Sequence, residues 1–173
     1  MEIRFLNADD APEWSRLRLE SLRNDPTAFS SSEEDDRARS LDEIKRRLGS
    51  ASADSFVVGA FENGRLVGMA GFHRETGLKS RHKGRVWGVY VTSASRGTGL
   101  GRKILETLLQ RAATIDGMEQ ILISVTTTQV AATALYRSLG FVPFGCELKA
   151  LKIDGQFIDE EHMAMVVKHP GCC

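Results

Sequence analysis

The sequence contains little cysteine, and what it contains lacks the paired spacing of a metal site. Among 173 residues there are three cysteines, Cys146, Cys172 and Cys173. No C-x-x-C pattern occurs, and two adjacent thiols make a poor disulfide framework. We therefore expect free thiols, no metal site and a reducing, cytoplasmic compartment.

Neither sign of charge is in excess, and no long apolar run is present. Lys and Arg total 23, Asp and Glu also total 23, and the formal net charge is zero. This balance does not predict the basic face that nucleic-acid binding needs. No apolar stretch approaches the ~20 residues of a membrane-spanning helix, and residues 1–6 lack the apolar run of a signal peptide. We expect neither a nucleic-acid partner nor a membrane partner.

The composition is that of a folded globular chain. Hydrophobic residues make up 42% and charged residues 27% of the sequence, the usual balance for a globular protein. The length suits one domain with a substantial core, and no repeat or linker interrupts it. We therefore expect a single domain over residues 1–173.

Apolar spacing predicts strands and helices in alternation. Strands are predicted at 3–5, 56–61, 66–72, 86–91, 121–125, from 141 onward, and 157–167. Helices are predicted from Asp9 or Asp10 to Asp25, and at 41–48, 100–112 and 130–139. Residues 30–36 are predicted to form either a surface loop or the start of an acidic helix.

The order of these elements predicts the fold class. Asn63-Gly64 has the signature of a two-residue hairpin turn, and hairpins stand beside a β-α-β-α stretch. We expect an α/β (α+β) protein with a single mixed, mostly antiparallel sheet of about seven strands, flanked by about four helices.

A glycine-rich segment between the strand at 86–91 and the helix at 100–112 carries the main chemical signal. It reads Arg96-Gly97-Thr98-Gly99-Leu100-Gly101. Glycines let a ligand approach the backbone, and the free N–H groups of a helix start attract an anion such as phosphate. A dinucleotide fold needs glycine where Arg102 stands, and a P-loop needs a Lys and a Ser or Thr that are absent. A tight turn without a ligand is the alternative.

Two further segments narrow the choice. Arg96-x-x-Gly99-x-Gly101 follows Val89-Tyr90-Val91, and Ala132-x-x-Leu135-Tyr136-x-x-x-Gly140-Phe141 lies downstream. The closing segment is Asp159-Glu160-Glu161-His162-Met163-Ala164-Met165. Together these motifs resemble those of the GCN5-related N-acetyltransferase (GNAT) superfamily, over nearly the whole chain. The resemblance implies a GNAT-like acyl-CoA N-acyltransferase fold.

The resemblance also implies a coenzyme A site. Val89 and Val91 would offer backbone groups to the pantetheine arm, and the backbone N–H groups from Arg96 to Arg102 would hold the pyrophosphate. Gln129 stands where many members have Asn, so it is either a contact to the arm or a surface residue. The implied cofactor-binding positions are Val89, Tyr90, Val91, Arg96, Gly97, Thr98, Gly99, Leu100, Gly101, Arg102, Gln129 and Ala132.

Tyr136 matches the family tyrosine that protonates the departing thiolate. General acid catalysis of this kind contributes about 10²–10⁴-fold. From helical spacing alone, Tyr136 would be a core aromatic between Leu135 and Leu139.

The general base is not evident from the sequence. Several members of the resembled superfamily place a glutamate on the strand before the glycine loop, but this chain has Val86-Trp87-Gly88 there. Glu33 and Glu34 are candidates, either as a base or as carboxylates that attract a cationic acceptor; the alternative is a solvated acidic run. His73 is a further candidate base or a structural histidine. A basic run at 79–85 would attract phosphates or an acidic acceptor, or is a solvated loop.

The predicted function is acetyl transfer from acetyl-CoA to a primary amine by direct attack in a ternary complex, with no metal. The alternatives are a non-catalytic acyl-CoA-binding sensor or interaction module, and a protein (N-terminal or lysine) acetyltransferase. We expect a monomer or a homodimer.

Overall fold

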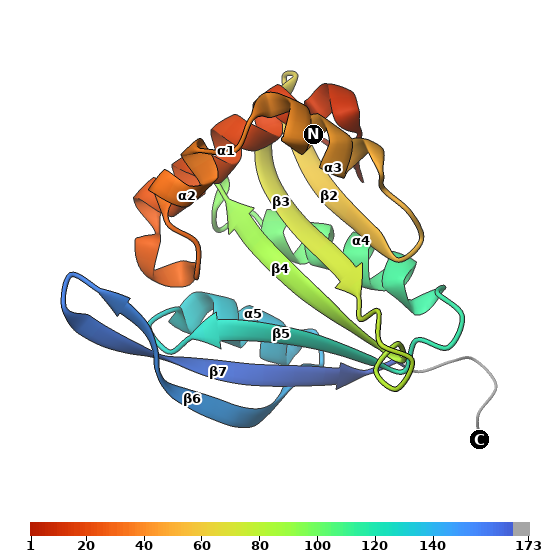
Figure 1. Cartoon of the computed structure of the whole chain (residues 1–173), viewed down its shortest axis with the longest axis vertical. Helices are drawn as coiled ribbons and strands as arrows, with labels where there is room; N and C mark the ends of the chain where they lie inside the picture. The colour runs from red at the N-terminus through yellow and green to blue at the C-terminus, as the bar shows by residue number, and fades with distance from the viewer. Residues whose placement is uncertain (168–173) are drawn as a thin grey trace.

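The computed structural model describes residues 1–167 and contains one seven-stranded sheet in the order β1-β2-β3-β4-β5-β7-β6 (Figure 1). Every neighbouring pair is antiparallel except β4 and β5, which are parallel. The predicted mixed, mostly antiparallel sheet of about seven strands is confirmed. The strands are β1 (Glu2–Phe5), β2 (Ser55–Glu62), β3 (Arg65–Arg74), β4 (Lys83–Val91), β5 (Gln120–Thr126), β6 (Val142–Ile153) and β7 (Gln156–Val166).

Within the described residues there are five α-helices, one more than expected. They are α1 (Ala11–Asn24), α2 (Glu33–Arg37), α3 (Leu41–Gly49), α4 (Leu100–Ala113) and α5 (Val130–Ser138). The additional helix, α2, falls in the segment for which both a loop and an acidic helix were predicted. Its N-cap is Ser32, whose hydroxyl accepts from the Asp35 N–H while the Asp35 carboxylate accepts from the Ser32 N–H.

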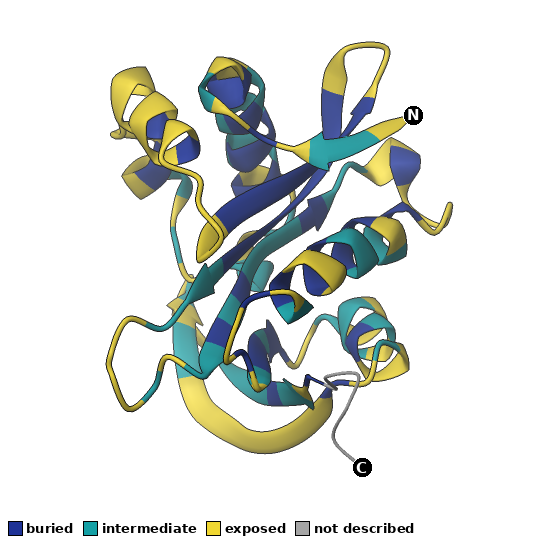
Figure 2. Cartoon of the chain, turned by 90° about the vertical axis from the view of Figure 1, so that its right-hand side faces the viewer, coloured by how far each residue is buried: buried dark blue, intermediate teal, exposed yellow. Residues whose placement is uncertain are grey.

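The helices cover both faces of the sheet, and each face has its own core. On one face α1 and α3 pack on β2 and β3, through residues such as Trp14, Leu48 and Met69. On the other face α4 contributes Ile104 and Leu108 to a larger cluster that α5 also joins. Figure 2 shows the buried residues on the strands and on the helix faces turned toward them. Because successive side chains on a strand point to opposite faces of the sheet, the same strands contribute residues to both cores.

The feature that shapes the site is the separation of β4 from β5. The two strands pair only from Lys83 to Arg85 opposite Gln120 to Leu122, and beyond that point they diverge (Figure 1). Opposite β3, Gly88 lies in a β-bulge with φ +62°, a value that glycine tolerates best. The diverging part of β4 therefore has an edge that no strand within residues 1–167 covers.

Of the three predicted free thiols, one belongs to a residue that the structure describes. Cys146 is a free, exposed thiol, as expected, whereas Cys172 and Cys173 lie outside residues 1–167. No helix in the part of the chain that the structure describes is long and apolar enough to cross a membrane.

Candidate functional site

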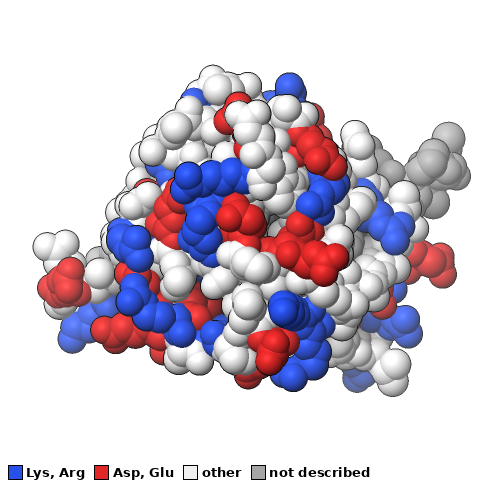
Figure 3. All heavy atoms as spheres, turned by 90° about the horizontal axis from the view of Figure 1, so that it is seen from above, with Lys and Arg blue, Asp and Glu red and all other residues white. Residues whose placement is uncertain are grey.

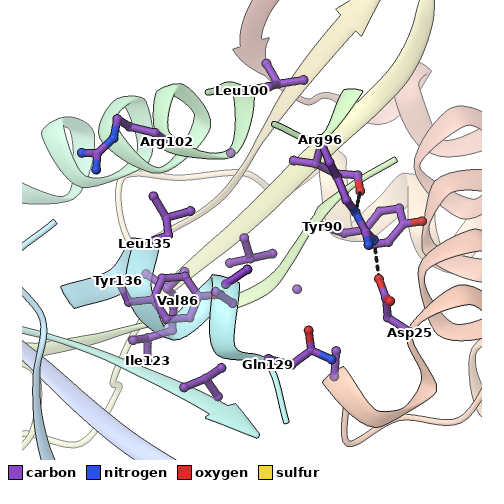
Figure 4. Close-up of a pocket in the computed structure, with 18 of the residues that line it drawn as sticks. Asp25, Val86, Tyr90, Arg96, Leu100, Arg102, Ile123, Gln129, Leu135 and Tyr136 are labelled. Atoms are coloured by element: carbon purple, nitrogen blue, oxygen red, sulfur yellow. Dashed lines mark hydrogen bonds and ion pairs between the residues drawn. The ribbon is translucent and has the colours of Figure 1, made fainter. Parts of the chain in front are cut away.

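A cavity of about 420 Å³ opens where β4 and β5 separate (Figure 4). It lies between the diverging strands, the start of α4 and one side of α5. Every predicted cofactor-binding residue except Thr98 lines it, and so does Tyr136. The Thr98 hydroxyl instead donates to the Ser95 carbonyl at 2.8 Å. The structure therefore gathers residues from three separated motifs around one space.

The glycine loop presents a row of free N–H groups to this cavity. The first helical hydrogen bond of α4 runs from the Lys103 N–H to the Gly99 carbonyl, at 3.2 Å. Within the described residues, no N–H from Gly97 to Arg102 donates to a protein acceptor. Gly97 and Gly99 have φ of +76° and +79°. These donors and the positive end of the helix dipole suit an anion such as a pyrophosphate.

The Arg96 side chain fixes the loop rather than extending into the cavity as a free cation. Its Nε donates to the Val91 carbonyl at 3.0 Å, and its guanidinium pairs with Asp25 at the end of α1 (Figure 4). The same guanidinium lies 5.4 Å from the centre of the Tyr90 ring. Because its charge is already paired, the loop's attraction for an anion comes chiefly from its backbone.

Tyr136 packs in the core and also borders the cavity. It is 5% exposed, and its ring packs edge-on against Phe141 at 6.2 Å. It also lines the cavity, and its hydroxyl has no hydrogen-bond partner within residues 1–167. Burial raises the pKa of Tyr136, so the phenol keeps its proton at neutral pH.

Gln129 occupies the N-cap position of α5 and lines the same cavity. Its side-chain amide donates to the Thr27 hydroxyl at 3.5 Å. This contact links the start of α5 to the turn η2 (Pro26–Ala28) that follows α1.

A second cavity, of about 430 Å³, adjoins the first. The two share a wall formed by Ala28, Phe29, Val86, Trp87, Gly88 and Ser124. Charged side chains dominate the rest of the second cavity. They are Arg18, Arg39, Arg47, Arg85, Glu160 and the titratable His73.

Glu160 is the carboxylate that lines the second cavity, and the search for a base in the sequence missed it. It lies on β7 opposite Thr126 of β5. Burial raises the pKa of Glu160, Glu147 raises it further, and His162 and Arg85 lower it. A carboxylate with a raised pKa beside a cavity is a candidate for proton transfer. Glu160 stands in the closing segment quoted above, but its position in the cavity depends on long-range strand pairing.

A short chain of polar contacts runs from the shared wall toward solvent. The Ser124 hydroxyl lies 2.8 Å from Nδ1 of His162, and Nε2 of His162 lies 3.5 Å from the Glu147 carboxylate. Glu147, Glu160 and His162 also present ligand atoms within 4.8 Å of one another. Exposed acidic groups such as Glu147 commonly cluster without an ion, so we assign no metal to them.

The three candidate bases from the sequence lie in different places. Glu33 pairs with Arg23 at 2.7 Å and with Arg37, and these hydrogen bonds lower its pKa. Glu34 is exposed on α2, and neither glutamate lines either cavity. His73 does line the second cavity, where burial lowers its pKa. The structure thus brings His73 to the site and leaves the two glutamates outside it.

The chain is similar in sequence and in structure to known acetyltransferases. The model of the acetyltransferase (GNAT) family matches residues 15–141. Over 105 residues the chain is 36% identical to N-alpha-acetyltransferase RimI of Mycobacterium tuberculosis, a match covering 61% of this chain and 63% of that protein. Over 88 residues it is 33% identical to spermine/spermidine N(1)-acetyltransferase of Bacillus subtilis, a match that covers 49% of this chain and 57% of that protein. The solved structure of a GNAT-family acetyltransferase of Streptococcus pneumoniae superimposes with a TM-score of 0.87 at 25% sequence identity. The superposition covers 96% of this chain and 99% of that protein's chain.

Proposed function

The chain belongs to the GNAT acetyltransferase family, and from that premise we propose that it transfers an acetyl group from acetyl-CoA to a primary amine. The observation that carries this proposal is the pair of adjoining cavities. One contains the free N–H groups and Tyr136, the other contains Glu160, and the two share one wall. An acetyl donor and an amine acceptor can therefore meet at that wall in a ternary complex.

Acetyl-CoA fits the first cavity in a defined direction. Its pyrophosphate would accept hydrogen bonds from the N–H groups between Gly97 and Arg102. Its pantetheine arm would run along the uncovered edge of β4, taking backbone bonds from Val89 and Val91 as an added strand would. Gln129 and Ala132 would flank the arm. The thioester then lies between the diverging strands, close to Tyr136.

The reaction needs a neutral amine, because an ammonium has no lone pair. We assign Glu160 as the group that accepts the proton from the ammonium. The amine nitrogen then attacks the thioester carbonyl, a C–N bond forms and the C–S bond breaks. Tyr136 donates its proton to the departing thiolate, and the second proton that the nitrogen loses on becoming an amide restores the Tyr136 phenol. The products are an N-acetyl amine and coenzyme A, and one proton is released to solvent.

The test of the acid role is Tyr136→Phe. Because Phe preserves the ring that packs on Phe141, we expect acetyl-CoA binding to stay nearly intact while turnover falls by about 10²–10⁴-fold. Binding would be measured by calorimetry and turnover by release of the free thiol. Unchanged turnover would remove Tyr136 from the mechanism.

A non-catalytic acyl-CoA-binding module is the second candidate. It is favoured by the segment Val86-Trp87-Gly88, which lacks the carboxylate that relatives place on this strand. The two functions separate when the wild-type protein is tested for thiol release across a panel of amines. A module of this kind would bind acetyl-CoA and release no thiol with any of them.

A further inference from the structure

The second cavity has a cationic wall that the reaction itself does not require. Guanidinium groups reach it from α1, from the segment between α2 and α3, from α3 and from β4. They belong to Arg18, Arg39, Arg47 and Arg85, and the one carboxylate among the lining residues is that of Glu160. Because the chain has no net charge, this concentration of arginine is local to the cavity.

The carboxylates nearby do not neutralise this wall completely. Asp36 is shared between Arg18, at 3.0 Å, and Arg39, at 3.2 Å. Arg85 has Glu75 at 3.7 Å. Arg47 forms no ion pair within residues 1–167. It is held instead over the ring of Trp87, 4.4 Å from the ring centre.

Arg18 adds an unused donor to the same wall. Its side chain is 10% exposed, and its Nη1 is buried without a hydrogen-bond partner. Leaving a buried charged donor unsatisfied is costly. Desolvation lowers the pKa of both Arg18 and Arg47, and repulsion from Arg39 lowers both further. An anion beside these groups would relieve both the repulsion and the missing hydrogen bond.

The arrangement disfavours a polyamine acceptor. A polyamine carries several ammonium groups and would need a mainly acidic cavity. The acidic residues of α2 cannot supply one, because Glu33 is paired with two arginines and Asp36 with two more.

We infer that the acceptor is a small zwitterion, an amine that also carries a carboxylate or phosphonate, and that Arg47 with Arg18 binds its anionic group. The planar guanidinium matches either anion with two parallel hydrogen bonds. Trp87, which supports Arg47, belongs to the wall shared with the first cavity. The anionic group therefore lies near the wall where the amine reacts, and Glu160 faces the ammonium end. This inference rests on the proposed acetyl transfer.

The first experiment compares three aminoethyl compounds that differ only in the second group, together with one polyamine. Thiol release is measured with β-alanine, aminoethylphosphonate, propylamine and spermidine, using the wild-type chain and acetyl-CoA. We expect kcat/KM for β-alanine or aminoethylphosphonate to exceed that for propylamine and spermidine at least about tenfold, because only the zwitterions gain charged hydrogen bonds from the arginines. Equal or better turnover of propylamine, spermidine or a neutral peptide N-terminus would overturn the inference and leave acetyl transfer standing.

The second experiment changes the cation. Arg47→Gln should reduce the preference for the zwitterion over propylamine at least about tenfold, through a higher KM for the zwitterion. Lys45→Gln removes one charge from the same helix but lines neither cavity, and it should leave the preference unchanged. Equal effects of both substitutions would point to a general electrostatic change and would overturn the role of Arg47.

A direct binding measurement separates the two proposals. If no amine releases thiol, acetyl transfer is disproved, and calorimetry with β-alanine and aminoethylphosphonate on the coenzyme A-saturated protein then decides the inference. Binding of either zwitterion that weakens in Arg47→Gln supports the anion subsite without catalysis. Absence of binding, or binding unaffected by Arg47→Gln, overturns it.

Discussion

Gly99 is the residue at which backbone conformation and ligand approach coincide. Its φ is +79°, and a Cβ placed there would meet nothing within 4 Å, because the position is open to space rather than to packed atoms. Alanine at such a φ costs about 1–2 kcal/mol. It would also shift the N–H groups that follow and place a methyl group where a phosphate would lie.

We therefore expect Gly99→Ala to weaken acetyl-CoA binding at least about tenfold, ~1.4 kcal/mol, and to lower the melting temperature. Gly64 is the matched control. It has φ of +78° in the hairpin turn and also has open space at its Cβ position. Gly64→Ala should cost similar stability and leave the dissociation constant unchanged. Calorimetry and thermal denaturation measure the two effects, and equal affinity of both variants for acetyl-CoA would argue against the loop as the phosphate site.

Glu160 should control how the rate depends on pH. Its pKa is raised above the usual 4.5, so kcat/KM should rise with pH through this raised value as the carboxylate ionises. Glu160→Gln should remove this limb and lower the rate about 10²–10⁴-fold. His162→Gln serves as the control. Since His162 lowers the pKa of Glu160, its removal should move the limb to higher pH without abolishing it. A limb that persists in Glu160→Gln would assign the base elsewhere.

Glu160→Gln should also change how the stability of the folded protein depends on pH. Because the pKa of Glu160 is raised in the folded state, folding favours the protonated carboxyl. The contribution of this group to the free energy of unfolding is therefore full below its unfolded pKa and is lost as pH rises through its folded pKa. Glu160→Gln should therefore be more stable than the wild type at pH 7, with a smaller difference near pH 4. Thermal denaturation at the two pH values would show that lost activity is not lost folding.

At the scale of elements, α2 depends on a contact with α1 that is distant in sequence. Arg18 and Asp36 are 18 residues apart and almost fully buried together. Asp36→Asn would leave the Arg18 charge unpaired, and breaking a buried pair typically costs about 3–5 kcal/mol. We expect faster amide hydrogen exchange over residues 30–40 and a lower free energy of unfolding.

The control for α2 is Glu33→Gln, which removes a carboxylate from the same helix. The partners Arg23 and Arg37 are 60% and 65% exposed, so solvent screens the pairs and the loss should be much smaller than that of Asp36→Asn. If Asp36→Asn costs no more than Glu33→Gln, the Arg18–Asp36 pair does not hold α2 in place.

Local signals explain which elements were predictable. The turn predicted at Asn63-Gly64 needs only two residues and is confirmed, with positive φ at both. The capping box that starts α3 at Ser40 is equally local, since it joins Ser40 only to Glu43. For residues 30–36 the dense acidic side chains were compatible with both a surface loop and the start of an acidic helix. The contact that settles the helix comes from Arg18, and no local pattern contains it.

The two cavities of the site also differ in how far their residues could be predicted from local sequence. The glycine loop is contiguous, so its residues could be named from the sequence, and all but Thr98 line one cavity. Glu160 and Arg47 meet in the second cavity from β7 and α3. Their proximity depends on the pairing of β5 with β7 and on the packing of α3 over Trp87. Strand pairing of this range is not encoded in any single segment.

At the scale of the whole molecule, the surface charges do not form a single field. Figure 3 shows Lys and Arg interspersed with Asp and Glu over the face seen from above. With a formal net charge of zero, long-range steering of an anionic cofactor should be weak. Recognition then depends on the cavities themselves, and above all on how β4 and β5 are held relative to each other.

The divergence of β4 from β5 predicts a stabilisation by ligand that involves both halves of the sheet. The two strands share backbone pairing over only three residues of each, and a bound acetyl-CoA would bridge the rest of the gap. A ligand at 100 times its dissociation constant stabilises the folded state by about 2.7 kcal/mol. For a chain of this size that corresponds to a rise in melting temperature of about 5–10 °C.

The comparison ligand for this measurement is acetylpantetheine, which has the thioester and the arm but no pyrophosphate. At the same concentration it should raise the melting temperature far less, because it leaves the N–H groups from Gly97 to Arg102 without an anion. Hydrogen exchange with acetyl-CoA should slow in β4 beyond Arg85 and in this loop. Equal thermal shifts from the two ligands would mean that the loop contributes nothing to binding, and the phosphate site would then have to be sought elsewhere on the chain.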